Sequence, residues 1–400
     1  MTDLLWPGDH RAGRLMSDRA YLDAMVGVEN AWLNLLVDTG AAPVAARADL
    51  TNLISAADIE VLAAGAEADG NPVVGLVALL RERAGGEAAR WLHRGLTSQD
   101  VIDTALMMCL RDALGGIREE LAGHVRVLVE LIETHRDDVM LARTLTQPAL
   151  PSTVAVKLAN WLCGVLDAAD ALAAVPSLPV QTGGAVGTHA AATELLGSPD
   201  AALAASDALA AALGLAPSAP WHTTRAVVTR TGDALVGCCD ACGHIAGDVA
   251  VGSRAEIGEF AEGAGGGSST MPHKHNPVLS VLIRRAALAA PALGATLHAA
   301  SSASVDERSD GGWHAEWATL RTLARRTVVA VRQTGDLLAD LRVDVARARA
   351  NLSAAGDLLA EQRVMSELTG RPPRSDYRGA TAHLVDAAVR RAHRLMKETM

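Results

Sequence analysis

The stretch of sequence that decides the fold runs over residues 106–131 and reads LMMCLRDALGGIREELAGHVRVLVEL. Its apolar residues recur in steps of three or four, at Leu106, Leu110, Leu114, Ile117, Leu121, Val125, Leu128 and Leu131. Because an α-helix repeats every 3.6 residues, these steps place the side chains on one face of one helix. The spacing therefore predicts an amphipathic helix of more than about 30 residues.

Comparable apolar patterns lie near residues 150–175, 222–260, 277–300 and 317–341. The chain is 50% hydrophobic but has only one Phe and two Tyr, so Ala, Leu and Val carry most of the apolar surface. This balance favours closely packed helices, because Ala has the highest helix propensity and a small side chain. We therefore predict an all-α protein, an elongated helical bundle with small N- and C-terminal helical domains.

Turn-forming residues suggest how the chain is divided. They cluster at residues 70–72, 183–184, 217–220, 263–267 and 370–373. We expect a helical N-terminal domain over residues 1–100, a central bundle of long helices over residues 101–344, and a short helical C-terminal domain over residues 345–400.

Charge and cysteine content exclude several classes of protein. A net charge of −10 without a stripe of Lys and Arg argues against nucleic acid as a partner, although local cations can still bind an anionic substrate. No basic and apolar leader opens the chain, and Arg284 and Arg285 interrupt the apolar segment after Pro277, so we expect a cytoplasmic protein without membrane contact. The five cysteines, with a single C-x-x-C at Cys239 and Cys242, predict buried thiols rather than disulfides or a zinc site.

The residues with the most chemical potential lie in the stretch GGGSSTMPHKHNP, residues 265–277. Its glycines allow many loop conformations with accessible N–H groups, its serines supply hydroxyls, and Lys274 supplies a cation. Asn276 and Pro277 form a favourable N-cap and first-turn pair, so a helix is expected to begin here. A helix N-terminus beside a lysine predicts an anion site, whereas a plain capped loop is the alternative.

The run Met-Pro-x-Lys-x-Asn-Pro after Gly-Ser-Ser resembles the signature of the fumarase/aspartase superfamily. Three further segments resemble elements of that superfamily in the expected order: WLHRGLTSQD at 91–100, RTLTQPALPST at 143–153 and QTGGAVGT at 181–188. Two more, PWHTTR at 220–225 and DERSDGGWHAEW at 306–317, resemble the 3-carboxy-cis,cis-muconate cycloisomerase branch. The resemblance covers most of the chain.

The resemblance implies which residues act on the substrate. Ser268 matches the catalytic base of the family, and His93 and Lys274 are expected as further catalytic residues. Members of the superfamily remove a proton beside a carboxylate and expel a group from the neighbouring carbon, or run the reverse addition. The enolate that forms needs fixed donors and cations, which Lys274, Asn276 and loop amides would supply.

The resemblance also implies how the substrate is held. The expected binding residues are Thr97, Ser98, Thr144, Gln147, Ser269, Met271, Asn276 and Arg308. Thr97 and Ser98 would cap the long helix and hold a carboxylate on its free N–H groups, while the guanidinium of Arg308 would grip both oxygens of another. A small di- or tricarboxylate substrate, a homotetramer with sites built from three subunits, and neither a metal nor an organic cofactor are implied.

Two positions depart from the adenylosuccinate lyase pattern. Pro148 stands where that family has a catalytic His, and Val281 stands where it has the carboxylate that partners this His. The His and its carboxylate partner are thus both absent, which favours a reaction that needs no second acid. We therefore predict a cycloisomerase of protocatechuate degradation, the β-ketoadipate pathway, that acts on 3-carboxy-cis,cis-muconate. The alternatives are another lyase with an anionic leaving group, such as nitrosuccinate lyase, adenylosuccinate lyase, and a noncatalytic structural bundle.

Overall fold

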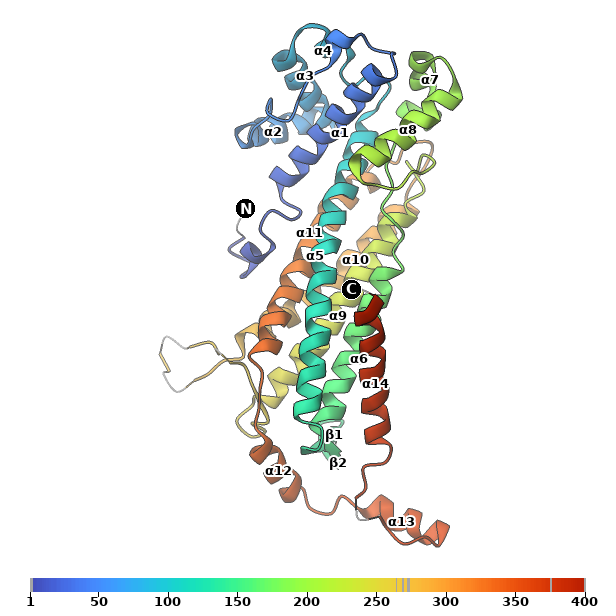
Figure 1. The fold of residues 1–400 in the computed structure, drawn as a ribbon. Coiled ribbons are helices and arrows are strands. Elements are labelled where there is room, and N and C mark those ends of the chain that lie inside the picture. Colours follow the sequence, from blue (N-terminus) through green and yellow to red (C-terminus); the bar gives the residue numbers. More distant parts are fainter. Residues whose placement is uncertain (1–2, 264, 268–269, 272–273, 375, 399–400) are drawn as a thin grey trace. The chain divides into compact units, whose positions relative to one another are not determined.

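The computed structural model describes residues 3–263, 265–267, 270–271, 274–374 and 376–398. Over these residues the chain is predominantly helical (Figure 1), with fourteen α-helices and two small antiparallel sheets of two strands each. The predicted all-α class is therefore confirmed.

The elements follow one another along the chain in the order of their labels. The helices are α1 (Asp18–Asp38), α2 (Ile59–Asp69), α3 (Val73–Ala84), α4 (Gly86–Trp91), α5 (Ser98–Thr134), α6 (Val154–Ala173), α7 (Ala190–Leu196), α8 (Pro199–Leu213), α9 (Ala226–Gly252), α10 (Val278–Ser302), α11 (Gly312–Ala339), α12 (Val345–Ala354), α13 (Ala360–Thr369) and α14 (Thr381–Glu398). The strands are β1 (Val139–Thr144), β2 (Gln147–Thr153), β3 (Phe260–Ala261) and β4 (Arg342–Val343).

The apolar stripe that predicts the longest helix lies on α5, which has 37 residues. Leu110, Ile117, Val125 and Leu128 of this stripe are fully buried. The other four apolar patterns correspond to α6, α9, α10 and α11. The two small sheets were not predicted, because strands this short leave little alternation in the sequence.

The chain forms two compact units, each assembled from separate segments. The first unit contains Met1–Gly116, Ala174–Asp233 and Ala292–Arg326, and the second unit contains Ile117–Ala173, Ala234–Pro291 and Thr327–Met400. The division into three consecutive domains stays a prediction.

In the second unit, α14 lies alongside α6 (Figure 1). The Nη2 atom of Arg391 on α14 is 2.6 Å from a carboxylate oxygen of Asp167 and 2.6 Å from one of Asp170, both on α6. Val385 and Ala392 of α14 are buried, so the last helix contributes apolar side chains to the core of this unit.

Two helices, α9 and α10, are long and apolar enough to cross a membrane by length and composition. Arg284 and Arg285, which interrupt the apolar segment after Pro277, do not prevent α10 from meeting this criterion. Half of the most apolar window of α9 is buried, as in the core helix of a soluble protein, but only 28% of the corresponding window of α10 is buried. Leu288 of α10 is 80% exposed and Val281 is 56% exposed. An exposed apolar surface of this kind is typical of a site that binds another protein surface or a membrane.

The C-x-x-C motif lies in the interior of α9. Cys239 and Cys242 are buried free thiols, as predicted, and so is Cys238. Burial raises the pKa of Cys239 to about 12 and that of Cys242 to about 11, so both stay protonated at neutral pH.

Candidate active site

The first unit brings two of the predicted binding residues into contact. Nη2 of Arg308 donates a hydrogen bond of 2.6 Å to Oγ1 of Thr97 and one of 3.2 Å to the carbonyl of Ala185. Nε of Arg308 is buried and has no partner among the residues that the structure describes. The guanidinium therefore keeps donor capacity for a further acceptor.

The contact between Arg308 and Thr97 lies at the N-terminus of α5, which begins at Ser98. The carboxylate of Asp100 accepts a hydrogen bond of 3.0 Å from the Thr97 amide, and the Thr97 carbonyl accepts from the amide of Asp100. This reciprocal pairing fixes the start of the helix. Over the described part of the chain, the amides of Ser98 and Gln99 have no protein acceptor, which suits the carboxylate binding predicted for this end.

Asp100 also connects α5 to the glycine-rich turn at residues 181–188. Its Oδ2 accepts from the amide of Gly184 at 3.0 Å, and its Oδ1 lies 3.2 Å from Nε2 of His222. A Cβ at Gly183 would lie 2.7 Å from Cε1 of His222, so only glycine fits there. In the sequence alone, this glycine-rich turn is weak evidence of a functional site. In the structure, the hydrogen bonds between Gly184 and Asp100 and between Ala185 and Arg308 place it beside Thr97.

Beneath this end of α5 lies a buried ion cluster that the sequence reasoning did not identify. Arg225 donates to Asp103 at 2.6 and 3.1 Å and to Glu316 at 2.6 and 2.9 Å, and Nε1 of Trp313 donates to Asp103 at 2.9 Å. Burial by itself lowers the pKa of Arg225, but the two carboxylates outweigh it and raise this pKa. The segments 220–225 and 306–317 therefore meet here.

His93 lies just before this region with an unusual backbone conformation. Its φ is 63°, in the left-handed region, and its Nδ1 is 2.6 Å from Oε1 of Glu29 on α1. The sequence reasoning missed Glu29. The signal was present, because Glu29 follows Met25 by four residues and precedes Leu33 by four on the buried stripe of α1.

In the second unit, Thr144 and Gln147 pair across the tip of the β1–β2 hairpin. The two turn residues have positive φ values, 47° for Leu145 and 69° for Thr146, which are costly for a branched residue such as Thr. All four tip residues are exposed. The hairpin is anchored beside its tip by Arg143, which donates two hydrogen bonds of 2.8 and 2.9 Å to the buried carboxylate of Glu259.

The loop with the family signature is closed at its base by a pair of hydrogen bonds between Gly266 and Asn276, 2.7 and 2.8 Å long. Lys274 and Met271 are exposed on this loop. Ser268 and Ser269 lie outside the described residues.

Two expectations about the helix after this loop were wrong. The helix α10 begins at Val278, and the first-turn amides of Leu279 and Ser280 donate to the carboxylate of Glu262 at 3.0 and 2.6 Å. Asn276 does not cap it, since its side-chain amide donates to the carbonyl of Gly267 at 3.4 Å. Because Glu262 already occupies these amides, they are not the predicted anion site.

The predicted site residues thus fall into two groups. The first unit holds His93, Thr97, Ser98 and Arg308, and the second unit holds the hairpin tip and the signature loop. Within each unit, the structure pairs Thr97 with Arg308 and Thr144 with Gln147. That both groups act on one substrate stays a prediction.

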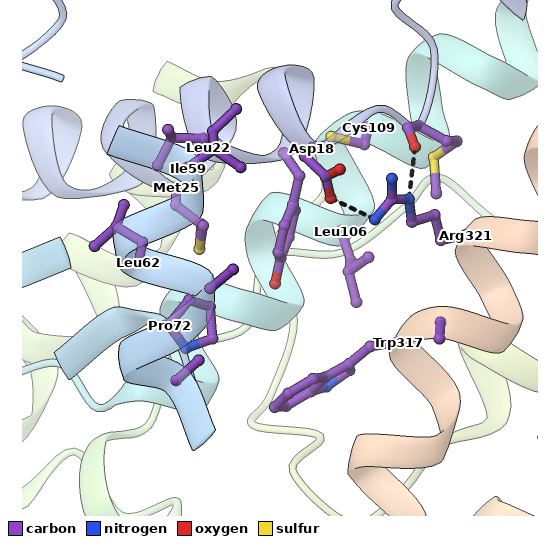
Figure 2. Close-up of a pocket in the computed structure, with 15 residues that line it drawn as sticks. Asp18, Leu22, Met25, Ile59, Leu62, Pro72, Leu106, Cys109, Trp317 and Arg321 are labelled. Carbon is purple, nitrogen blue, oxygen red and sulfur yellow. Dashed lines mark hydrogen bonds and ion pairs between the residues drawn. The ribbon is translucent and has the colours of Figure 1, made fainter. Parts of the chain in front are cut away.

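An apolar cavity of about 340 Å³ in the first unit is shown in Figure 2. Its walls include Leu22 and Met25 of α1, Leu62 of α2, Leu106 of α5 and Trp317 of α11. The predicted site residues do not line it. Its cation, Arg321, is already bound to Asp18 and to the carbonyl of Met16, so the cavity does not suit a polycarboxylate.

Comparison with known proteins places these features in a wider context. A family model described as Lyase matches residues 21–291. Nitrosuccinate lyase of Streptomyces davaonensis is 41% identical over 366 residues, which cover 88% of this chain and 77% of that protein. The 3-carboxy-cis,cis-muconate cycloisomerase of Bradyrhizobium diazoefficiens is 39% identical over 386 residues, which cover 94% of this chain and 83% of that protein.

A solved structure is also similar over nearly the whole chain. The crystal structure of the 3-carboxy-cis,cis-muconate lactonizing enzyme from Pseudomonas putida superposes with a TM-score of 0.87 at 31% sequence identity. The match covers 96% of this chain and 97% of that one.

Proposed function

Because the chain belongs to this lyase family and is an enzyme of the fumarase/aspartase superfamily, we propose that it interconverts 3-carboxy-cis,cis-muconate and its carboxymuconolactone. The proposal rests first on Arg308. A buried guanidinium nitrogen without an acceptor is costly, and a substrate carboxylate at the start of α5 would supply the acceptor. The relatives that carry this activity in their names support the choice of substrate.

The proposed reaction moves one proton. In lactone formation, a carboxylate oxygen of the substrate forms a C–O bond to one carbon of a double bond, and the neighbouring carbon receives a proton. The reverse reaction breaks both bonds and releases the carboxylate. We assign the proton to Ser268 and the remaining carboxylates to Lys274 and Arg308. A carboxylate is stable as a leaving anion, so the reaction does not require a catalytic His with a carboxylate partner, the pair whose positions Pro148 and Val281 occupy here.

A second candidate substrate is nitrosuccinate. It is favoured by the 41% identity to nitrosuccinate lyase, which is slightly higher than the 39% identity to the cycloisomerase of Bradyrhizobium. Nitrite also leaves as a stable anion, so the same residues would serve. Adenylosuccinate has a poorer leaving group and is not expected to react.

We expect purified enzyme to consume 3-carboxy-cis,cis-muconate, measured as loss of its ultraviolet absorbance. The Ser268→Ala variant should lower kcat by at least about 10²-fold, the lower range for loss of a general acid or base. Ser353→Ala is the matched control, because Ser353 is an exposed helical serine bonded only to the carbonyl of Arg349.

Other outcomes of this assay decide against the proposal. Turnover of nitrosuccinate with nitrite release, and none of the muconate, would establish the second candidate. Fumarate release from adenylosuccinate, or no turnover of any of the three compounds, would contradict the leaving-group argument.

We further propose that the enzyme is a cytoplasmic homotetramer whose sites combine residues of different subunits. Two features support association. The helix α10 exposes Val281 and Leu288 although it is among the most apolar helices, and the hairpin tip with Thr144 and Gln147 is exposed and strained. Neighbouring copies would cover the apolar face of α10. They would also place the hairpin tip against a substrate that another subunit binds.

Light scattering is expected to give a mass near four times the 41.4 kDa of one chain. Mixing inactive His93→Ala and Ser268→Ala proteins under conditions of subunit exchange should restore part of the activity, because some sites then receive both intact residues. An active monomer would contradict the assembly. A protein that is extracted only with detergent would instead assign the apolar face of α10 to a membrane.

A further inference from the structure

We infer that Glu29 is the positioning residue for His93 and that it makes Nε2 of this histidine the nitrogen that contacts the substrate. The inference rests on the proposed function, in which His93 is a residue of the active site. Glu29 would act through His93 and would not touch the substrate itself.

Glu29 has no exposed surface, and the only hydrogen bond of its carboxylate in the described structure is the one of 2.6 Å between Oε1 and Nδ1 of His93. Its Oε2 atom is buried without a partner. A carboxylate in an apolar stripe is costly unless it has a partner, and it is seldom buried without a specific role. His93 is the partner that the structure supplies.

Arg81 on α3 lies close enough to Glu29 to interact with its charge: burial and the neighbouring Arg94 lower the pKa of Arg81, whereas Glu29 raises it. An ionised carboxylate can only accept hydrogen bonds, so Nδ1 of His93 carries the hydrogen and donates it. The neutral imidazole then has its free electron pair on Nε2.

The backbone on both sides of His93 is also fixed. Nη2 of Arg81 donates to the carbonyl of Leu92 at 2.9 Å, and Nε1 of Trp32 donates to the carbonyl of Arg94 at 2.7 Å. Trp32 lies three residues after Glu29, on the same face of α1. One helix therefore holds both the side chain and the left-handed backbone of His93, a strained conformation that persists only where its surroundings determine it.

These contacts leave one nitrogen of His93 available. The side chain is 18% exposed, and Nε2 has no hydrogen-bond partner in the part of the chain that the structure describes. With Nδ1 held by Glu29, Nε2 accepts a proton when the ring is neutral and donates one when it is charged. A histidine oriented by a third group is a usual arrangement where the imidazole acts on a substrate.

The inference is tested first without substrate. In the ¹⁵N-labelled full-length protein, the imidazole nitrogen signals that disappear in His93→Gln identify His93 among the histidines. At a pH where the ring is neutral, we expect hydrogen on Nδ1 in the wild type and a mixture of both tautomers in Glu29→Gln. A wild-type ring with its hydrogen on Nε2 would overturn the inference whatever the substrate proves to be.

Kinetics then test whether Glu29 acts through His93. Glu29→Gln should lower kcat by about 10-fold to 10²-fold with a change in KM of less than about 3-fold, and Glu29→Asp, which keeps the charge, should recover part of the loss. In a His93→Gln background, Glu29→Gln should cause no further loss. Asp38→Asn, a carboxylate change at the exposed end of α1, is the control. Equal losses in both backgrounds would show that Glu29 is merely structural.

Discussion

Replacement of Arg225 by Met is expected to destabilise each protomer by about 3–5 kcal/mol, the cost of removing one partner from a buried ion pair. The side chain of Arg225 is 1% exposed, and its two partners, Asp103 and Glu316, are 0% and 2% exposed. Methionine fills much of the volume but leaves both carboxylates buried without a cation. Thermal unfolding at one protein concentration would measure the loss, because the stability of an oligomer depends on concentration.

The matched control for this variant is Arg14→Met. Arg14 also binds a carboxylate, that of Asp23, at 2.6 Å, but its side chain is 74% exposed. An exposed pair contributes less than about 1 kcal/mol, so this variant should unfold almost as the wild type does. If Arg225→Met were equally stable, the cluster around Asp103 would not hold the segments 220–225 and 306–317 together.

Replacement of Arg308 by Gln is expected to lower kcat/KM by at least about 10²-fold. Hydrogen bonds to charged groups are worth about 1.5–3 kcal/mol each, and the variant loses a fork that would make two of them to a carboxylate. Arg308→Lys keeps the charge but not the fork, so its kcat/KM should lie between those of Gln and wild type. Initial rates at low concentrations of the assigned substrate measure this effect.

The unfolding temperature of the Arg308 variants shows whether a loss of kcat/KM comes from weaker substrate binding or from a less stable fold. Arg308 has one bond to Thr97 and one to Ala185, so its loss should change the unfolding temperature far less than the loss of Arg225. Arg14→Gln controls for the change of net charge. An Arg308→Gln enzyme with normal kcat/KM would remove the guanidinium from substrate binding.

The periodicity of apolar residues in the sequence was sufficient to predict the long helices. The stripe of α5 was predicted because a regular helix places apolar residues spaced by three or four on one face, and this repeat is a local property. The same holds for α6, α9 and α11. It does not hold for the β1–β2 hairpin, whose conformation at Leu145 and Thr146 departs from what those residue types prefer.

The sequence by itself also predicted which chemical groups the site contains, because the signature loop, Thr97 and Arg308 stand in recognisable motifs. Only the tertiary structure decided which groups pair. Asp103 and Arg225 are separated by 122 residues, and Glu29 and His93 by 64. Glu262 displaced the expected cap of α10 in the same way. Apolar spacing records which face of a helix is buried, but the choice of a partner for a buried charge depends on contacts that only folding creates.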